Sequence, residues 1–197
     1  LGFTVAGRDI RFGLLAVKNL GRGFLQHIVS ERETNGPFSS FFDFCKRLFE
    51  QMNRRALESL IKCGSLDGLD LNRRQMLENA GSVLDFLEAD RKKNVEGQLG
   101  FFDTGNAGEG AQEFLVSPMR DFSDREKLAY EKEVTGMFLS GHPMAAFLGR
   151  YEQLGAVRIG DLVNDADASQ YRDGDRVTVL GIISSMQMKV TKSGSTM

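Results

Sequence analysis

Apolar residues recur at helical spacing along most of the first 90 positions of this 197-residue chain. Two helices are predicted over residues 14–18 and 24–29, on either side of the short break Leu20-Gly21-Arg22-Gly23. Further helices are predicted where a polar residue can cap the N-terminus or a glycine can end the helix. These cover residues 41–49 after Ser39-Ser40, 54–63 between Asn53 and Gly64, and 73–87 after Asn72. Residues 1–90 are therefore expected to form a helical domain.

Strand patterns are confined to the two ends of the chain. Residues 3–5 and 10–12 flank Ala6-Gly7-Arg8-Asp9 and predict a short β-hairpin. Residues 177–183 and 186–190 follow the turn Asp173-Gly174-Asp175 and read as two paired strands. Because two strands alone are marginally stable, residues 171–197 are expected to be the start of a larger β domain.

The middle of the chain changes character near Asp90. Residues 91–122 are rich in glycine and mixed charges and poor in aliphatic residues, which predicts a flexible linker. A helical segment is expected over residues 123–170, with one helix running from Ser123 toward Phe138 and a short one near 145–150. Residues 157–162 are ambiguous between helix and strand. The predicted fold class is mainly α, with a short β-hairpin at the N-terminus and a small β segment at the C-terminus.

Composition is ordinary for a soluble globular protein, with 41% hydrophobic and 26% charged residues. No apolar run reaches the roughly 18–20 residues that span a bilayer, so no membrane partner is expected. Cys45 and Cys63 lie in apolar helical stretches, which favours buried, reduced thiols over a disulfide. Reduced thiols are in turn typical of an intracellular protein, so a cytoplasmic location is expected. His27 and His142 have no partners at metal-ligand spacing. Since the chain starts without Met and stops inside a strand pattern, we interpret it as a piece of a longer protein.

The break between the first two predicted helices carries candidate binding chemistry. A tight hairpin directs backbone N–H groups outward at the start of its second helix, where they can receive a phosphate oxygen. Gly21 and Gly23 allow positive φ or a close approach of a ligand, and Lys18 and Arg22 add cationic side chains. Residues 1–74 hold 12 Lys and Arg against 8 Asp and Glu, which places an anionic partner at this end. An ordinary helix–helix turn explains the spacing equally well.

A second candidate lies inside the predicted linker, at Gln98-Leu99-Gly100-Phe101-Phe102. Large apolar residues in a polar, glycine-rich segment often mark a site for a protein partner. Leu99, Phe101 and Phe102 would insert into a pocket while Gln98 makes a polar contact at its rim. The alternative is that both phenylalanines fold back onto the helical domain.

Other groups of residues are better explained by structure than by chemistry. The aspartates of 165–167 and 173–175 lie among turn residues and favour solvated turns over a metal site. The phenylalanines of residues 38–49 fit core packing better than base stacking. Arg54-Arg55 and Arg73-Arg74 could contact phosphates, but solvated helix faces are the preferred interpretation of such pairs. Nothing in the sequence indicates a complete active site, and no catalytic residue is assigned.

Five stretches of the chain resemble one known family: IRFGLLAVKNLGRG (10–23), GPFSSFFDFCKR (36–47), NRRALESLIKCGSLDGL (53–69), EKLAYEKEVTGMFLSGHPM (126–144) and RVTVLGIISSMQMKVTKSGSTM (176–197). The family is that of the bacterial replicative DNA polymerase III α subunits, and the stretches resemble its C-terminal half. The resemblance covers nearly the whole chain except the linker. It implies that the chain is part of a DNA-directed DNA polymerase, a nucleotidyltransferase that takes part in DNA replication.

The resemblance also implies roles for the two candidate sites. Lys18, Gly21, Arg22 and Gly23 would belong to a helix-hairpin-helix element that holds duplex DNA by its phosphates. Gln98, Leu99, Phe101 and Phe102 would form the sliding-clamp-binding pentapeptide, with Phe at a position often held by Leu. The last strands would open an OB-fold, truncated here. The family's catalytic aspartates and Mg²⁺ belong to an upstream domain, so no cofactor is expected in this chain.

Three functions remain to be distinguished. The first is a non-catalytic segment of a replicative polymerase that holds DNA and the sliding clamp, in contact with other replisome subunits. The second is a stand-alone DNA-binding repair module that lacks clamp binding. The third is a purely structural interaction fragment, which predicts no DNA affinity and no effect of replacing Lys18 and Arg22 by Ala.

Overall fold

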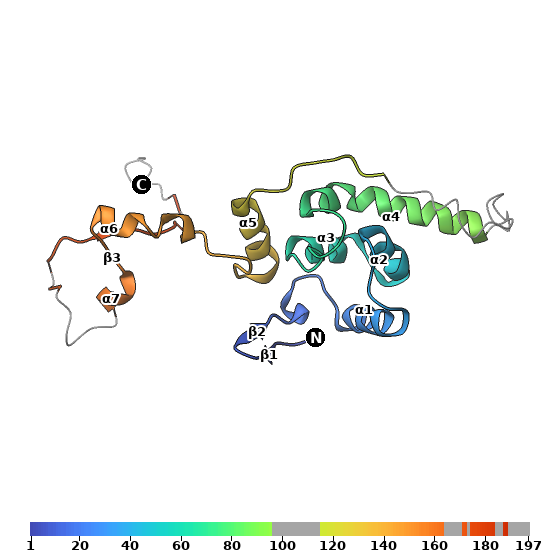
Figure 1. The fold of residues 1–197 in the computed structure, drawn as a ribbon, viewed down its shortest axis with the longest axis horizontal. Coiled ribbons are helices and arrows are strands. Elements are labelled where there is room, and N and C mark those ends of the chain that lie inside the picture. The colour runs from blue at the N-terminus through green and yellow to red at the C-terminus, as the bar shows by residue number, and fades with distance from the viewer. Residues whose placement is uncertain (96–114, 164–170, 173, 184–186, 189–197) are drawn as a thin grey trace. The chain divides into compact units, whose positions relative to one another are not determined.

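The computed structural model describes residues 1–95, 115–163, 171–172, 174–183 and 187–188 of the chain. It divides into two compact units, Leu1–Ser140 and Gly141–Met197. The described part of the first unit is built mainly of helices, as the sequence predicts (Figure 1). Its elements are β1 Thr4–Ala6, β2 Asp9–Arg11, a 3-10 helix Leu14–Ala16, α1 Arg22–Asn35, α2 Phe41–Leu48, a 3-10 helix Phe49–Gln51, α3 Arg54–Lys62, α4 Arg73–Val95 and α5 Asp124–Thr135.

Side-chain caps fix where most of these helices begin. The Asn53 Oδ1 atom accepts a hydrogen bond from the Ala56 N–H at 2.9 Å, and Ser40 caps α2 in the same way. Asn72 caps α4 by accepting from the Gln75 N–H at 2.9 Å, while the Gln75 side chain accepts from the Asn72 N–H at 3.2 Å. Ser123 opens α5 with the reciprocal pair of bonds that defines a capping box. These caps are those that the sequence predicts.

The hydrophobic core of the first unit lies among α1 to α4. α3 packs against both α4 and α5, and α2 packs against α4. Fully buried side chains at the centre include Phe41, Leu48, Leu57, Leu60, Ile61, Met76 and Val83. Phe44 is also buried, so the core reading of the phenylalanine-rich helix is confirmed. Cys45 and Cys63 are buried free thiols, and burial raises the pKa of Cys45 to about 12.

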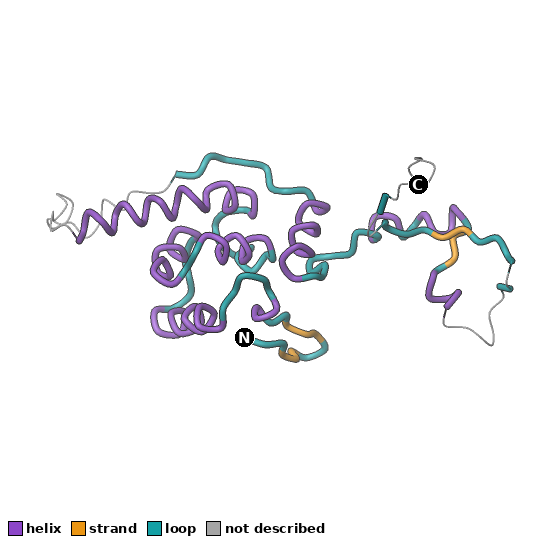
Figure 2. The backbone as a smooth tube through the Cα atoms, turned by 180° about the vertical axis from the view of Figure 1, so that it is seen from behind, coloured by secondary structure: helices purple, strands orange, loops and turns teal. Residues whose placement is uncertain are grey.

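The first predicted helix of the hairpin is shorter than expected. Residues 14–16 form one 3-10 turn, in which the Ala16 and Val17 N–H groups donate to Gly13 and Leu14. The next N–H, that of Lys18, donates instead to the Val134 carbonyl of α5 at 2.8 Å. The helix cannot propagate because this donor is used outside the segment. The β-hairpin before it is confirmed (Figure 2). Its strands are antiparallel, with Val5 opposite Ile10.

Two helix ends also differ from prediction. α4 continues through residues 91–95, supported by an ion pair between Glu88 and Lys92 at 2.9 Å. α5 ends at Thr135 because Gly136 adopts a left-handed conformation with φ 78°. Phe138 therefore lies beyond the helix. The last part of the predicted linker, residues 117–122, lies against the start of α4.

The second unit holds short elements: a 3-10 helix Ala145–Phe147, α6 Arg150–Leu154, β3 Ala156–Val157, α7 Ile159–Val163 and β4 Thr178–Val179. The predicted strand over residues 177–183 is only two residues long and pairs in parallel with β3. Its expected antiparallel partner, residues 186–190, lies mostly outside the described residues, and the OB-fold stays a prediction. The turn at Gly174 is confirmed, with φ 90° and a hydrogen bond from the Asp175 N–H to the Arg172 carbonyl.

None of the helices in the described ranges is long and apolar enough to span a lipid bilayer.

Candidate nucleic-acid interface

The turn between residues 17 and 21 is fixed by its apolar side chains and by one strained residue. Val17 and Leu20 are buried in the core. Asn19 has φ 64°, in the left-handed region that non-glycine residues rarely occupy. Its Nδ2 atom donates to the Ser59 Oγ atom of α3 at 3.0 Å. The positive φ of the hairpin therefore falls at Asn19 and not at Gly21 or Gly23.

The N-terminus of α1 has no cap within the described part of the molecule. Gly21 is its N-cap residue, with φ −81° and ψ 147°, and so offers no side-chain acceptor. Gly21, Arg22 and Gly23 are all exposed, and the first turn of α1 carries no acidic residue. The first N–H groups of a helix have no acceptor within the helix. These donors, together with the helix dipole, suit an anion from outside.

Neither glycine of this site is required by the fold. A Cβ atom added to Gly21 or Gly23 would meet no heavy atom within 4 Å. Gly23 lies within α1, where glycine is less favourable than alanine by about 1 kcal/mol. The absence of side chains instead leaves space for another molecule to approach the backbone.

Two cationic side chains flank these amides. Arg22 is exposed, and no described residue forms a hydrogen bond or ion pair with its guanidinium group. Lys18 is also exposed, but its Nζ atom donates to the Glu133 carbonyl at the end of α5 at 2.7 Å. An ammonium group has three N–H donors, so Lys18 keeps donors for a further acceptor. The structure thus brings Lys18, Gly21, Arg22 and Gly23 to one turn and the helix that follows it.

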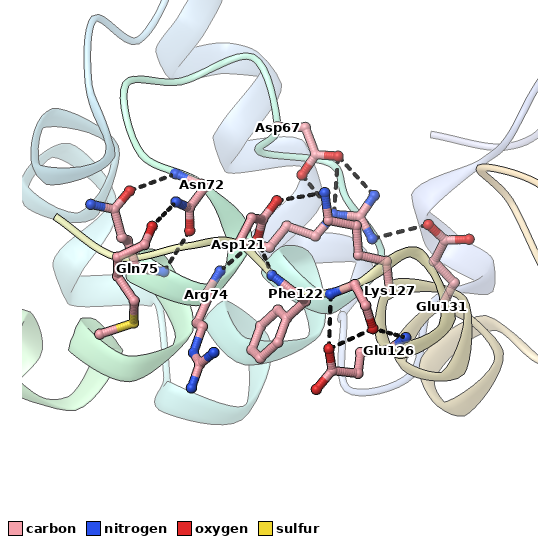
Figure 3. Close-up of polar contacts among 12 residues, drawn as sticks. Asp67, Asn72, Arg74, Gln75, Asp121, Phe122, Glu126, Lys127 and Glu131 are labelled. Atoms are coloured by element: carbon pink, nitrogen blue, oxygen red, sulfur yellow. Dashed lines mark hydrogen bonds and ion pairs between the residues drawn. The ribbon is translucent and has the colours of Figure 1, made fainter.

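The second predicted site, Gln98, Leu99, Phe101 and Phe102, lies outside the described residues. The segment after it is held on α4 by polar contacts (Figure 3). Asn72 Nδ2 donates to the Met119 carbonyl at 2.8 Å, and the N–H groups of Arg74 and Phe122 donate to Asp121. This part of the predicted linker is therefore fastened to the helical unit.

A buried ion network near this segment is not predicted from the sequence. Arg73 is 5% exposed, which corrects its reading as part of a solvated face, while Arg54, Arg55 and Arg74 are exposed as expected. The Arg73 guanidinium donates to Asp67 at 2.7 Å and to the fully buried Glu131 at 2.9 Å (Figure 3). The Glu131 Oε2 atom also accepts from the Leu139 and Ser140 N–H groups at 2.7 and 2.9 Å.

The network lowers the pKa of Glu131 and leaves no space for a side chain at Gly64. Burial raises the pKa of Glu131, but the N–H groups of Ser140 and Leu139 and the Arg73 guanidinium outweigh it and leave that pKa lowered. Gly64 has φ 77°, and a Cβ there would overlap the Arg73 guanidinium. Glycine is therefore required at this position, the predicted end of α3, for two reasons: the left-handed backbone and the space that the guanidinium occupies. No spacing within a helix relates Arg73 to Glu131, so no local pattern could reveal their contact.

Among the described residues, no group of three or more His, Cys, Asp or Glu side chains could hold a metal ion. Asp165 and Asp167 lie outside the described residues, and Asp175 accepts a hydrogen bond from the Arg172 N–H of its turn.

Known proteins match this chain both around the hairpin and over nearly its whole length. A family model described as a helix-hairpin-helix motif matches residues 1–76, which include the hairpin turn and α1. The chain is 37% identical to the DNA polymerase III subunit alpha of Deinococcus radiodurans and 35% identical to that of Thermus aquaticus. Both alignments cover 99% of this chain. The corresponding protein of Borreliella burgdorferi is 32% identical over 96% of the chain. The chain spans 15–16% of the length of these relatives.

Proposed function

Because the chain belongs to the family of the bacterial DNA polymerase III α subunits, we propose that it holds duplex DNA by its backbone during replication. The observation that carries this proposal is the exposed N-terminus of α1, which has no side-chain cap and lies inside the helix-hairpin-helix match. Its free N–H groups would donate hydrogen bonds to phosphate oxygens, and Lys18 and Arg22 would supply positive charge. Such contacts carry no base information, so binding would be independent of sequence and weaken with salt.

The cationic contribution is tested by replacing Lys18 and Arg22 together with Ala. We expect the double variant to bind a random-sequence duplex roughly tenfold or more weakly at ~0.1 M salt, since two phosphate contacts are lost. Fluorescence anisotropy titrations measure the affinities. Lys46→Ala with Lys92→Ala is the matched control, because both side chains are exposed on other helices. Equal losses in the two double variants would contradict the site.

We further propose that Gln98, Leu99, Phe101 and Phe102 bind the sliding clamp, with the three apolar side chains in its hydrophobic groove. The support is the family membership together with the match to the clamp-binding pattern. The polymerase would then be tethered at the primer end, which raises its effective concentration there. Synthesis itself, with its magnesium ions, would be carried out by other parts of such a polymerase.

Titration of the full chain with purified sliding clamp tests this second proposal. Replacing Phe101 and Phe102 together with Ala should abolish measurable binding, because both apolar anchors are removed. Leu115→Ala is the matched control, since Leu115 is 85% exposed and lies outside the pentapeptide. If the Phe101→Ala, Phe102→Ala variant binds the clamp as the natural chain does, the assignment is wrong.

A further inference from the structure

A partly open pocket lies beside the hairpin turn of the first unit. Asn19 lines it from the turn, Arg55 and Lys62 from α3, and Glu133 from the end of α5. Asn19 is two residues from Gly21, the N-cap residue of α1. The pocket and the exposed amides of α1 are therefore neighbouring parts of one surface.

The charges around this pocket are unevenly matched. Its two acidic residues are each paired with a lysine or arginine: Glu58 with Arg54 at 2.8 Å and Glu133 with Lys62 at 2.7 Å. Arg55 is left without a carboxylate partner in the described part of the chain, because no described residue forms an ion pair or hydrogen bond with its guanidinium group. An exposed cation without an internal partner, beside a pocket with hydrogen-bond donors, suits an external anion.

We propose that this pocket is a second site for a DNA backbone phosphate, bound by Arg55 and Lys62. The inference rests on the proposed duplex binding by the hairpin and extends its footprint onto α3. In the free protein, the Glu133 carboxylate accepts a hydrogen bond from the Lys62 Nζ atom at 2.7 Å, as a phosphate oxygen would do. The Glu133 carbonyl holds Lys18 in the same way. Lys62 keeps further N–H donors, but the negative charge of the Glu133 carboxylate beside it should weaken the binding of a phosphate.

Neutralising Glu133 separates this idea from a merely structural role, because it should increase affinity. The Glu133 side chain is 55% exposed, so losing its ion pair should barely affect folding. In the full chain, Glu133→Gln should bind a random-sequence duplex roughly two- to fivefold more tightly, the equivalent of one exposed ion pair. Glu88→Gln is the control, since the Glu88 side chain is 49% exposed and forms an ion pair of similar length, 2.9 Å, with Lys92 on α4. The control should leave the affinity unchanged.

Two further variants identify the cations involved. In a Lys62→Ala background, Glu133→Gln should give no more gain than Glu88→Gln. Arg55→Ala should reduce the slope of log affinity against log salt by about 0.9, the contribution of one phosphate contact. An equal gain from Glu133→Gln and Glu88→Gln, or an unchanged slope for Arg55→Ala, would overturn the second site.

The outcomes also separate this inference from the proposed function. If the natural chain binds no duplex, duplex binding itself is wrong and the second site fails with it. If the natural chain binds and Glu133→Gln has no effect, only the second site is wrong. Inorganic phosphate at equal ionic strength is the remaining arm: should millimolar phosphate abolish the Glu133→Gln gain, the pocket is a small-anion site and not part of a duplex footprint.

Discussion

Replacing Glu131 with Gln is expected to destabilise the first unit by about 3 kcal/mol. Glu131 is fully buried and faces the guanidinium group of Arg73, which is itself 5% exposed. A glutamine oxygen can still accept from Leu139 and Ser140, but its NH₂ group would then face Arg73. The arginine charge would keep only the half-exposed Asp67 as a partner. Urea unfolding followed by circular dichroism measures the loss.

Glu133→Gln is the control for this experiment, because it makes the same chemical change two residues away on α5. Glu133 forms an exposed ion pair, so we expect a loss of ~1 kcal/mol or less. The pKa of Glu131 is lowered in the folded state, so its stabilisation is full above the ordinary carboxyl pKa of about 4.3 and disappears as pH falls through the lower folded value. Glu131→Gln should therefore lose less stability on acidification. Equal destabilisation by the two variants would contradict the buried network.

Replacing Gly23 with Asp is expected to abolish duplex binding while the fold becomes slightly more stable. An aspartate in the first turn of α1 interacts favourably with the helix dipole, and removing a helical glycine adds to this, for a gain of roughly 0.5–1 kcal/mol. The added Cβ meets no atom of the protein. The carboxylate would occupy the space of a phosphate and repel it. Anisotropy with a random-sequence duplex and urea unfolding provide the two measurements.

Gly149→Asp is the matched control for Gly23→Asp. Gly149 is exposed, a Cβ there meets no atom within 4 Å, and the residue lies in the second unit at the N-cap of α6. It adds the same charge near the start of a helix that is not part of the hairpin. Similar weakening by the two aspartates would indicate a general charge effect and argue against a site at α1. Loss of both binding and stability in Gly23→Asp would also contradict the account.

Local patterns in the sequence predict most of the helical unit. Asn53 and Gly64 bracket α3 correctly because a side-chain cap and a left-handed glycine act within a few residues of the helix. The same holds for Ser40 and Asn72. The 3-10 turn at residues 14–16 is not predicted, because the acceptor of the Lys18 N–H lies on α5, more than a hundred positions away. A contact of that range leaves no trace in hydrophobic spacing.

The candidate site shows the same division. Lys18, Gly21, Arg22 and Gly23 are adjacent in the sequence, so their clustering follows from the turn itself. The residues that surround them come from other helices and are found only in the structure, including Glu133 and Ser59. Arg73 reads as a surface residue because pairs of arginines usually lie on solvated helix faces, and only the structure shows that it is buried against Glu131.

The salt dependence of duplex binding tests the central account most directly. Binding to backbone phosphates predicts that log affinity falls linearly with log salt, equally for two unrelated sequences. It also predicts that Lys18→Ala with Arg22→Ala reduces the magnitude of the slope by about 1.8, the value for two phosphate contacts. An affinity that depends on sequence, or a slope that the double variant leaves unchanged, would show that the hairpin does not hold the DNA backbone.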